Sequence, residues 1–188
     1  MKYLLLLTLG KLCDMISNCY WLIIYSRYRM DYSIDKSFQF NGKSILFYGD
    51  GRISAGPSSY VGGFSTLQAA KAYSITIGKK CKISHNVRIY TQSAIADYDF
   101  SLSNNPQKYG DVTLEDYCWI GANVFISPGV TVGANSVVGA NSVVSKSIPP
   151  NEIWGGVPAK LIRRKKNTLN IQVNNEEKLT PARVSDDR

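Results

Sequence analysis

A residue period of six runs through the middle of the chain and constrains its fold more than any other feature. Aliphatic residues stand at every sixth position at Leu114, Ile120, Ile126, Val132, Val138 and Val144. Four places after each comes a second, mostly small residue, at Cys118, Val124, Val130, Ser136, Ser142 and Ile148. Helices repeat near 3.6 residues and half-buried strands near 2, so only a short strand followed by a turn explains this period. Three such units would close a triangular coil, and stacked coils would pair their strands at ~4.8 Å around a buried aliphatic ladder.

The same register appears upstream, so the coil is expected to begin well before residue 114. It occurs at Val61, Leu67, Ile77, Ile83 and Ile89, with Cys81 and Val87 as second inward residues. The repeat stops between Thr91 and Asp111, and residues 92–110 are polar. This pattern predicts a loop that leaves one corner of the coil, and long loops of this kind are more often functional than accidental.

The repeat divides the chain into three expected parts. Residues 1–44 form an N-terminal helical segment and connector, and residues 45–160 form an all-β, parallel β-helix domain with the protruding loop 92–110. Pro149 and Pro150 end the repeat. Residues 161–188 are expected to form a basic segment with a short C-terminal helix and a polar, frayed tail.

The N-terminal segment mixes apolar residues with charges. Trp21 and many leucines and isoleucines alternate with Lys11, Asp14, Arg27 and Arg29, which predicts one or two amphipathic helices. Such a helix either packs on the main domain or lies on an anionic bilayer as an interfacial helix. The charges interrupt any stretch near the ~20 apolar residues that a membrane span needs. No small-residue cleavage site clearly follows the first apolar run, so a signal peptide is not expected.

Charge and cysteine usage limit the partners and the compartment. The formal net charge of +8 would attract coenzyme phosphates, an anionic membrane or nucleic acid. Zinc-finger spacings and the aromatic motif of an RNA-binding sheet are both missing, so no nucleic-acid partner is expected. The four cysteines lack the close spacing of a secreted disulfide framework. We therefore expect a cytoplasmic protein, with peripheral contact at the inner membrane face as an open alternative.

Three phrases resemble one enzyme family. They are Trp119 to Val124, Pro128 to Gly133 and Gly156 to Lys160. Together they resemble the bacterial hexapeptide-repeat acetyltransferases, which include galactoside, maltose, serine and polysaccharide O-acetyltransferases. This resemblance implies a left-handed parallel β-helix, a homotrimer, and acetyl-CoA as cosubstrate in a groove between subunits, without a metal ion. The left hand comes from the resemblance, because the general rule for parallel crossovers predicts a right-handed coil.

The resemblance also implies which residues line the coenzyme groove. By motif position these cofactor-binding candidates are Trp119, Ala122, Ala140, Ser145, Lys160 and Arg163. Small side chains at Ala122 and Ala140, one coil apart, would keep a channel open. Lys160 and Arg163 would form charge-assisted hydrogen bonds with the coenzyme's phosphates. The alternative is that the alanines are ordinary turn residues and the basic run is a solvated face.

His85 is the candidate catalytic base. Acetyl transfer needs a group that takes the acceptor's proton, and imidazole, which titrates near neutral pH, suits this task. His85 is the chain's single histidine, while galactoside-type members carry the base where Ile95 stands here. If the loop replaces one corner, the face of Ile83 also holds Ile120 and Val138, and His85 would lie below Ala122. Asp97 and Asp99 would orient the ring or simply be solvated, and a neighbouring subunit is another source of the orienting group. The oxyanion donor is unassigned, and a backbone amide near Gly121 or a loop amide would serve. An exposed turn histidine of no consequence is the alternative.

The expected function is acetyl-CoA-dependent O-acetylation of a sugar hydroxyl of a surface polysaccharide or its precursor, by direct transfer. The sugar preference rests on resemblance of the phrase Ile83 to Val87, with Ile89 to Thr91, to polysaccharide acetyltransferases. A nucleotide-sugar N-acetyltransferase, a xenobiotic acetyltransferase and a non-catalytic β-helix binding module stay open. A γ-class carbonic anhydrase is nearly excluded, because its zinc needs three histidines.

Overall fold

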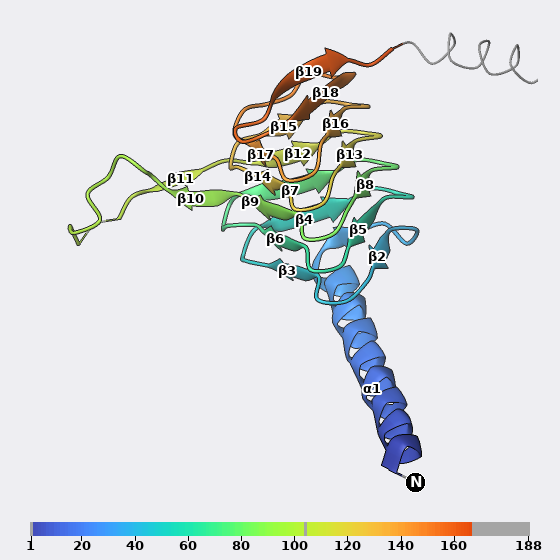
Figure 1. Cartoon of the computed structure of the whole chain (residues 1–188). Helices are drawn as coiled ribbons and strands as arrows, with labels where there is room; N and C mark the ends of the chain where they lie inside the picture. Colours follow the sequence, from blue (N-terminus) through green and yellow to red (C-terminus); the bar gives the residue numbers. More distant parts are fainter. Residues whose placement is uncertain (1, 104, 167–188) are drawn as a thin grey trace, which may run out of the picture.

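The computed structural model describes residues 2–103 and 105–166 and consists of a long helix followed by a parallel β-solenoid. Helix α1 (Lys2–Asp31) extends from one end of the solenoid (Figure 1). About five triangular coils stack above it, each contributing one strand to each of three parallel sheets. The parallel β-helix predicted from the period of six is therefore confirmed.

The strands are short because each unit of six residues must also include a corner turn. Coils 1 to 3 contain β1 (Ser33–Ile34), β2 (Gln39–Asn41), β3 (Leu46–Tyr48), β4 (Arg52–Ala55), β5 (Tyr60–Gly62), β6 (Thr66–Gln68), β7 (Ser74–Ile77), β8 (Lys82–Ile83) and β9 (Arg88–Tyr90). Coils 4 and 5 contain β12 (Val112–Leu114), β13 (Trp119–Ile120), β14 (Phe125–Ile126), β15 (Thr131–Val132), β16 (Val137–Val138) and β17 (Val143–Val144).

Strand pairing defines the three faces of the solenoid. Sheet A has the order β1-β4-β7-β12-β15, and sheet C has the order β17-β14-β9-β6-β3. Sheet B contains β2, β5, β8, β13 and β16 and continues into two C-terminal strands, β18 (Glu152–Gly155) and β19 (Lys160–Arg164). Ile83 is in register with Ile120, and Ile120 is in register with Val138. Because anchors of successive coils lie in register, the aliphatic ladder forms the core, and all six of its members from Leu114 to Val144 are buried.

The polar insertion forms an arm. Strands β10 (Gln92–Ala94) and β11 (Gln107–Tyr109) pair antiparallel, and the hairpin projects sideways from the stack (Figure 1). It leaves the corner between β9 of sheet C and β12 of sheet A. The predicted loop at residues 92–110 is thus an arm at one corner, and the solenoid resumes its register after it.

The solenoid begins and ends differently from the expected boundaries. β1 pairs with β4 and β2 pairs with β5, so the first coil starts at Ser33, ahead of the expected boundary at residues 44 and 45. At the other end, residues 160–164 form strand β19, not part of a helix, because they pair antiparallel with β18. The expected C-terminal helix is wrong for this stretch, and the polar tail at residues 167–188 lies outside the described residues.

Helix α1 docks on the first coil through aromatic rings at its C-terminal end. Tyr25 stacks on Phe40 with ring centroids 4.4 Å apart, and Tyr28 stacks on Phe47 at 5.3 Å. The hydroxyl of Tyr25 donates to the carbonyl of Gly42 at 2.8 Å, and burial raises the pKa of this tyrosine. This end of α1 matches the expected docking helix, and it closes the open end of the hydrophobic core.

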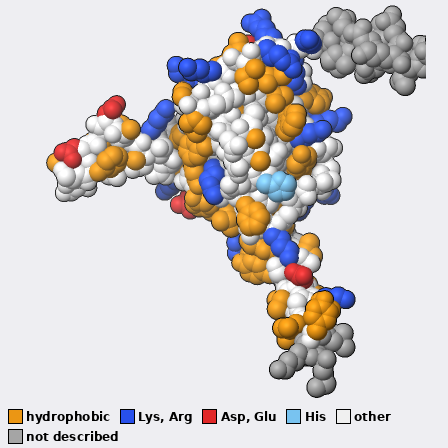
Figure 2. Space-filling model, in the orientation of Figure 1, with side chains coloured by type: hydrophobic (Ala, Val, Ile, Leu, Met, Phe, Trp, Pro, Cys, Tyr) orange, Lys and Arg blue, Asp and Glu red, His pale blue; other side chains and the backbone are white. Residues whose placement is uncertain are grey.

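The rest of α1 projects away from the solenoid with apolar side chains on its surface (Figure 2). Leu12 and Met15 are exposed, as are Ile16 at 59% and Ile23 at 69% of their surface. Within the described residues, no helix combines the length and the apolar content that crossing a bilayer requires.

Candidate functional site

His85 lies at the corner between sheets B and C, two residues after its buried anchor Ile83. The carbonyl of His85 accepts a hydrogen bond from the amide of Asn123 at 3.0 Å, and the carbonyl of Ala122 accepts one from Asn141 at 2.8 Å. His85, Ala122 and Ala140 therefore occupy equivalent positions in three successive coils. The structure agrees with the column expected from counting residues around the coil.

The His85 side chain is exposed on the outer surface of the solenoid. It is the pale blue side chain in Figure 2, because the chain has a single histidine. Among residues 2–103 and 105–166, its ring has neither a hydrogen-bond partner nor an ion-pair partner. The ring is thus accessible to a substrate, and its orienting group is not supplied by these residues.

The acidic residues of the arm do not orient this ring within one chain. Asp97 and Asp99 follow β10, at a different corner from His85. The Asp99 carboxylate accepts hydrogen bonds from Ser101, including the backbone amide at 2.9 Å, and these bonds lower its pKa. Asp99 therefore stabilises the turn of the arm.

The prediction of an oxyanion donor near Gly121 is wrong for the amide of Gly121 itself. That N–H donates to the carbonyl of Val138 at 2.8 Å as part of the parallel ladder of sheet B. An amide engaged in a ladder has no free proton for a substrate oxygen.

Two further coenzyme candidates lie on the outer face of sheet B. Trp119 is in register with Lys82 of the coil below and Val137 of the coil above, and it is 53% exposed. Arg163 lies on β19, opposite Ile153, with its side chain exposed. Both side chains lie on sheet B, and the chain passes from this sheet into the corner that holds Ala122 and Ala140.

Ser145 and Lys160 meet in a pocket beneath the C-terminal hairpin. The cavity has a volume of about 350 Å³ and is lined by Ser145, Lys146, Trp154, Pro158, Ala159, Lys160 and Leu161. The turn of the hairpin lies over β17, since Ala159 donates to the carbonyl of Val143 at 2.8 Å. Ser145 comes after β17 and thus at a different corner from Ala122 and Ala140. The six coenzyme candidates are therefore distributed over a corner column, the face of sheet B and this pocket.

A buried carboxylate positions the pocket's aromatic wall. Glu152 is 4% exposed, and its Oε2 accepts a hydrogen bond from the indole Nε1 of Trp154 at 2.8 Å. Its Oε1 lies 3.4 Å from Nε of Arg164. Sequence reasoning missed Glu152, Trp154 and Lys146, because no repeat position marks them. The phrase Gly156 to Lys160, which begins two residues after Trp154, was the available signal for this region.

The basic run after the pocket is partly engaged with the solenoid. Lys165 donates to Oδ1 of Asn135 at 2.7 Å, and burial lowers the pKa of its amine. Lys160 and Arg163, in contrast, are exposed. Both predicted phosphate ligands are therefore accessible to a coenzyme.

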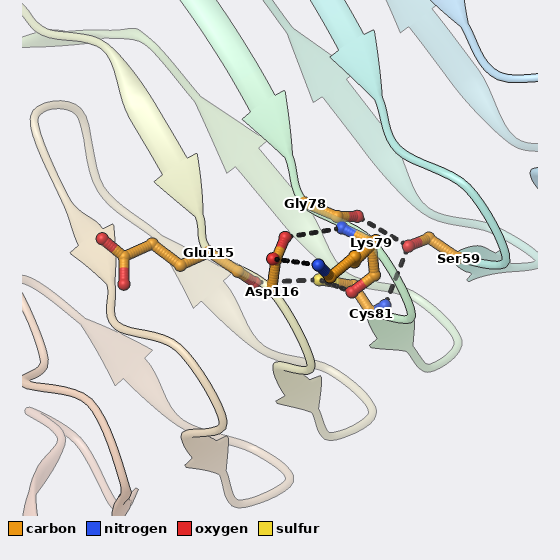
Figure 3. Close-up of polar contacts among 6 residues, drawn as sticks. All are labelled: Ser59, Gly78, Lys79, Cys81, Glu115 and Asp116. Carbon is orange, nitrogen blue, oxygen red and sulfur yellow. Dashed lines mark hydrogen bonds and ion pairs between the residues drawn. The ribbon is translucent and has the colours of Figure 1, made fainter.

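A separate polar cluster joins coils 2, 3 and 4 at the corner between sheets A and B (Figure 3). Asp116 accepts a hydrogen bond from the backbone amide of Lys79 at 2.9 Å and forms an ion pair with its amine at 3.4 Å. The hydrogen bond from the Lys79 amide is the main cause that lowers the pKa of Asp116. In turn, Asp116 raises the pKa of Lys79. The Ser59 hydroxyl donates to Gly78 and accepts from the amide of Cys81. Because these groups bind one another, the cluster is structural.

The described part of the chain contains no group of three or more histidine, cysteine or acidic side chains arranged to hold a metal ion. All four cysteines are free thiols, with Cys81 and Cys118 buried in the core and Cys13 and Cys19 exposed on α1.

Comparisons with known proteins agree on the repeat. The model of the bacterial transferase hexapeptide (six repeats) matches residues 111–146. Galactoside O-acetyltransferase of Escherichia coli K12 is 41% identical over 92 residues, which are 48% of this chain and 44% of that protein. The putative colanic acid biosynthesis acetyltransferase WcaF of E. coli K12 is 34% identical over 95 residues, half of each chain. The chain thus spans about half the length of the curated relatives it matches.

A solved structure supports the fold. A variant of AntD, an N-acyltransferase from Bacillus cereus, was determined with dTDP-4-amino-4,6-dideoxyglucose and coenzyme A. It superposes with a TM-score of 0.59 at 22% identity, covering 78% of this chain and 87% of that chain. At this level of identity the likeness concerns the fold alone.

Proposed function

We propose that this chain, whose residues 111–146 match the model of the bacterial transferase hexapeptide, is an acetyl-CoA-dependent O-acetyltransferase that acts on a sugar hydroxyl. The observation that carries the proposal is the position of His85, which is exposed at a coil corner directly below Ala122 and Ala140.

In the proposed reaction, His85 acts as the general base. Its unprotonated imidazole nitrogen takes the proton of the acceptor hydroxyl as that oxygen attacks the thioester carbonyl. The carbon–sulfur bond then breaks, the acetyl group stays on the acceptor oxygen, and the imidazolium returns its proton to the departing thiolate. The proposed transfer is direct, because no serine or cysteine of the described residues is hydrogen-bonded to the ring of His85 as a nucleophile paired with a base would be.

The coenzyme is proposed to bind along the coil edge and under the hairpin. Ala122 and Ala140 present small side chains along the corner column, and Trp119 flanks them on sheet B. Ser145 and Lys160 share the 350 Å³ pocket walled by Trp154. In the proposal, Lys160 and Arg163 bind the phosphates through charge-assisted hydrogen bonds, and the bound acetyl-CoA supplies the activated thioester.

The sugar acceptor is supported by the names of relatives. Galactoside O-acetyltransferase and a putative colanic acid biosynthesis acetyltransferase match this chain at 41% and 34% identity. We propose a hydroxyl of a surface polysaccharide or its precursor, with a sugar-nucleotide amine as the competing acceptor, since AntD is an N-acyltransferase solved with a dTDP-amino sugar.

We also propose a cytoplasmic homotrimer that touches the membrane through α1. Three copies would bring the arm of one chain toward the site of another, which would supply the orienting group that His85 lacks within the described residues. The free thiols fit a reducing compartment. The exposed side chains of Leu12, Ile16 and Ile23 fit shallow insertion into the bilayer interface.

A transfer assay tests the proposed activity. Release of free coenzyme A from acetyl-CoA would be measured with neutral sugars, sugar phosphates, sugar nucleotides and lipid-linked glycans, and products would be identified by mass spectrometry. Acetylated hydroxyl products are expected. Acetylation of amines alone would select the sugar-nucleotide alternative, and the absence of both coenzyme binding and transfer would select a non-catalytic β-helix.

A further inference from the structure

Phe64 stands at a corner position where an aromatic side chain is costly. The corners between sheets B and C place one residue of each coil in the left-handed region, with φ of 59° at Ser44, 64° at Phe64, 55° at Asn86, 59° at Asn123 and 58° at Asn141. Asparagine tolerates this conformation well, whereas a bulky residue there is an outlier. Phe64 adopts this conformation despite the cost.

In the later coils, the asparagines at this corner form a ladder of side-chain hydrogen bonds. Asn86 donates its side-chain amide to Oδ1 of Asn123 at 2.9 Å, and Asn123 donates to Oδ1 of Asn141 at 2.9 Å. Phe64 interrupts this ladder directly below Asn86. It is 64% exposed and takes no part in the core cluster or in any ring contact among the described residues. Packing therefore gives no reason for an aromatic residue here.

Phe64 instead lines a cavity on the outer face of sheet C. This cavity has a volume of about 490 Å³ and is bounded by Ser44, Leu46, Phe64, Thr66, Asn86 and Arg88. The lining combines an aromatic face, hydroxyls, an amide and a guanidinium. Such a mixture is typical of sites that bind carbohydrate rings, because an aromatic ring covers the apolar face of the sugar while polar groups bind its hydroxyls.

Arg88 is held in place inside this cavity. Its Nη1 donates to the Thr66 hydroxyl at 3.2 Å and its Nη2 to Oδ1 of Asn86 at 3.0 Å. Thr66 is buried, so the first contact fixes the guanidinium against the sheet. No carboxylate of the described residues lies within ion-pair distance of Arg88. A guanidinium carries five N–H donors, so this fixed cation keeps donors available for a ligand anion.

The lining of the cavity adjoins the corner that carries His85. Asn86 directly follows His85, and the backbone amide of Asn86 donates to the carbonyl of Gly63 at 2.9 Å. The turn of Phe64 therefore lies one coil below the turn of His85. Gly62 allows this approach, because a Cβ on it would lie 2.7 Å from the backbone nitrogen of His85. Adjacent coils are separated by ~4.8 Å, so the corner of Phe64 lies about one coil spacing from the corner of His85, although His85 itself does not line the cavity.

We propose that this cavity is the acceptor subsite and that the acceptor is a negatively charged sugar. The Phe64 ring stacks on the sugar ring, and Arg88 binds a phosphate or carboxylate substituent. The inference rests on the proposed acetyl transfer and deepens it, because it names the charge of the substrate. Phosphate and carboxylate share the anionic chemistry that Arg88 recognises, and probes that carry one or the other distinguish them.

Binding of three probes to the full chain tests this subsite. Glucose 1-phosphate, glucuronate and glucose would be titrated while ligand-observed NMR follows saturation transfer, with and without acetyl-CoA. At least one anionic probe is expected to bind about tenfold or more tightly than glucose, the usual scale of a charge-assisted hydrogen bond. Equal binding of all three probes would overturn the proposal.

Two variants locate the binding. Arg88→Gln should abolish the preference for the anionic probe, whereas Arg52→Gln, on the outer face of sheet A, should preserve it as the matched control. Phe64→Asn should weaken binding of every probe about tenfold, while its thermal midpoint stays the same or rises, because asparagine suits the corner. Loss of binding with a lowered midpoint or an altered oligomeric mass would assign Phe64 to structure or to an interface and would refute the subsite.

These outcomes are separable from those of the proposed activity. Acetyl transfer to neutral sugars that both variants leave unchanged would support the transferase and reject the anionic subsite. Probe binding that depends on Arg88, without transfer to any acceptor, would support the subsite and reject the transferase.

Discussion

The amide of Asn123 donates to the carbonyl of His85 at 3.0 Å, which fixes the single histidine one coil directly below Ala122. This bond belongs to the repeating corner pattern, so it holds the backbone of His85 rigidly while the side chain stays exposed. A base held on a rigid corner suits a reaction whose second substrate lies along the same edge.

Replacing His85 with alanine should remove the base and leave the corner intact. We expect kcat to fall by about 10² or more, the usual scale for loss of a general base, with the Kd for acetyl-CoA nearly unchanged. Steady-state kinetics and calorimetry would measure the two quantities. Ser84→Ala, one residue earlier in the same turn, is the control, and an unchanged kcat in His85→Ala would refute the assignment.

Replacing Lys160 with alanine should weaken the coenzyme site selectively. The KM for acetyl-CoA should rise about tenfold, the cost of a lost charge-assisted hydrogen bond, while kcat changes little. Lys71→Ala removes an exposed charge from the corner after sheet C in coil 2 and should leave KM as it is. Equal effects of the two variants would indicate that only net charge matters.

Replacing Ile120 with alanine should create a cavity in the aliphatic ladder. Ile120 is fully buried and in register with Ile83 and Val138, so we expect a loss of about 2–5 kcal/mol in the free energy of unfolding. Urea denaturation would measure this loss. Val157→Ala, at a position 71% exposed, should change the free energy by less than about 0.5 kcal/mol. Similar losses in both variants would contradict the ladder.

Asp116 should contribute to stability at neutral pH and lose that contribution in acid. Its pKa is lowered from the ordinary 3.8, chiefly by the Lys79 amide, so the folded state favours the carboxylate. The contribution is present above the unfolded value of 3.8 and disappears as pH falls through the lower folded value. The urea midpoints of the wild type and of Asp116→Asn should therefore differ at pH ~6, and the difference should narrow steadily as the pH falls below 3.8.

The control for this pH effect is Asp97→Asn in the arm. The described residues supply no hydrogen-bond or ion-pair partner for Asp97, so its replacement should shift the urea midpoint equally little across this pH range. A gap between wild type and Asp116→Asn that persists unchanged in acid would show that the carboxylate's charge does not stabilise the corner.

Exposed isoleucines of α1 should mediate membrane contact. The pair Ile16→Asp and Ile23→Asp should reduce co-flotation of the full chain with vesicles that contain anionic lipid, because both side chains are exposed and apolar. Asn18→Asp adds a charge to the same helix without removing an apolar group and serves as control. Flotation that does not change in the paired variant, or the absence of any flotation of the wild type, would reject this contact.

The sequence by itself determined the solenoid, the arm and the position of His85. A period of six admits one arrangement of short strands and turns, and counting from Ile83 through Ile120 to Val138 was enough to predict which residues share a face. The pairing of β8, β13 and β16 confirms that count. The solenoid is local and repetitive, so each unit repeats the information of its neighbour, and the arm is recognised because the repeat stops there.

Only the tertiary structure decided what lies at the ends and on the outer surface. Residues 160–164 form a strand because they pair with β18. The buried Glu152 binds Arg164 and also Trp154, which lines the pocket of Ser145 and Lys160. The cavity of Phe64 and Arg88 combines corner and outward strand positions of three coils. Such sites depend on pairing between distant segments and on the identity of outward side chains, and the period of the buried aliphatic residues carries no information about either.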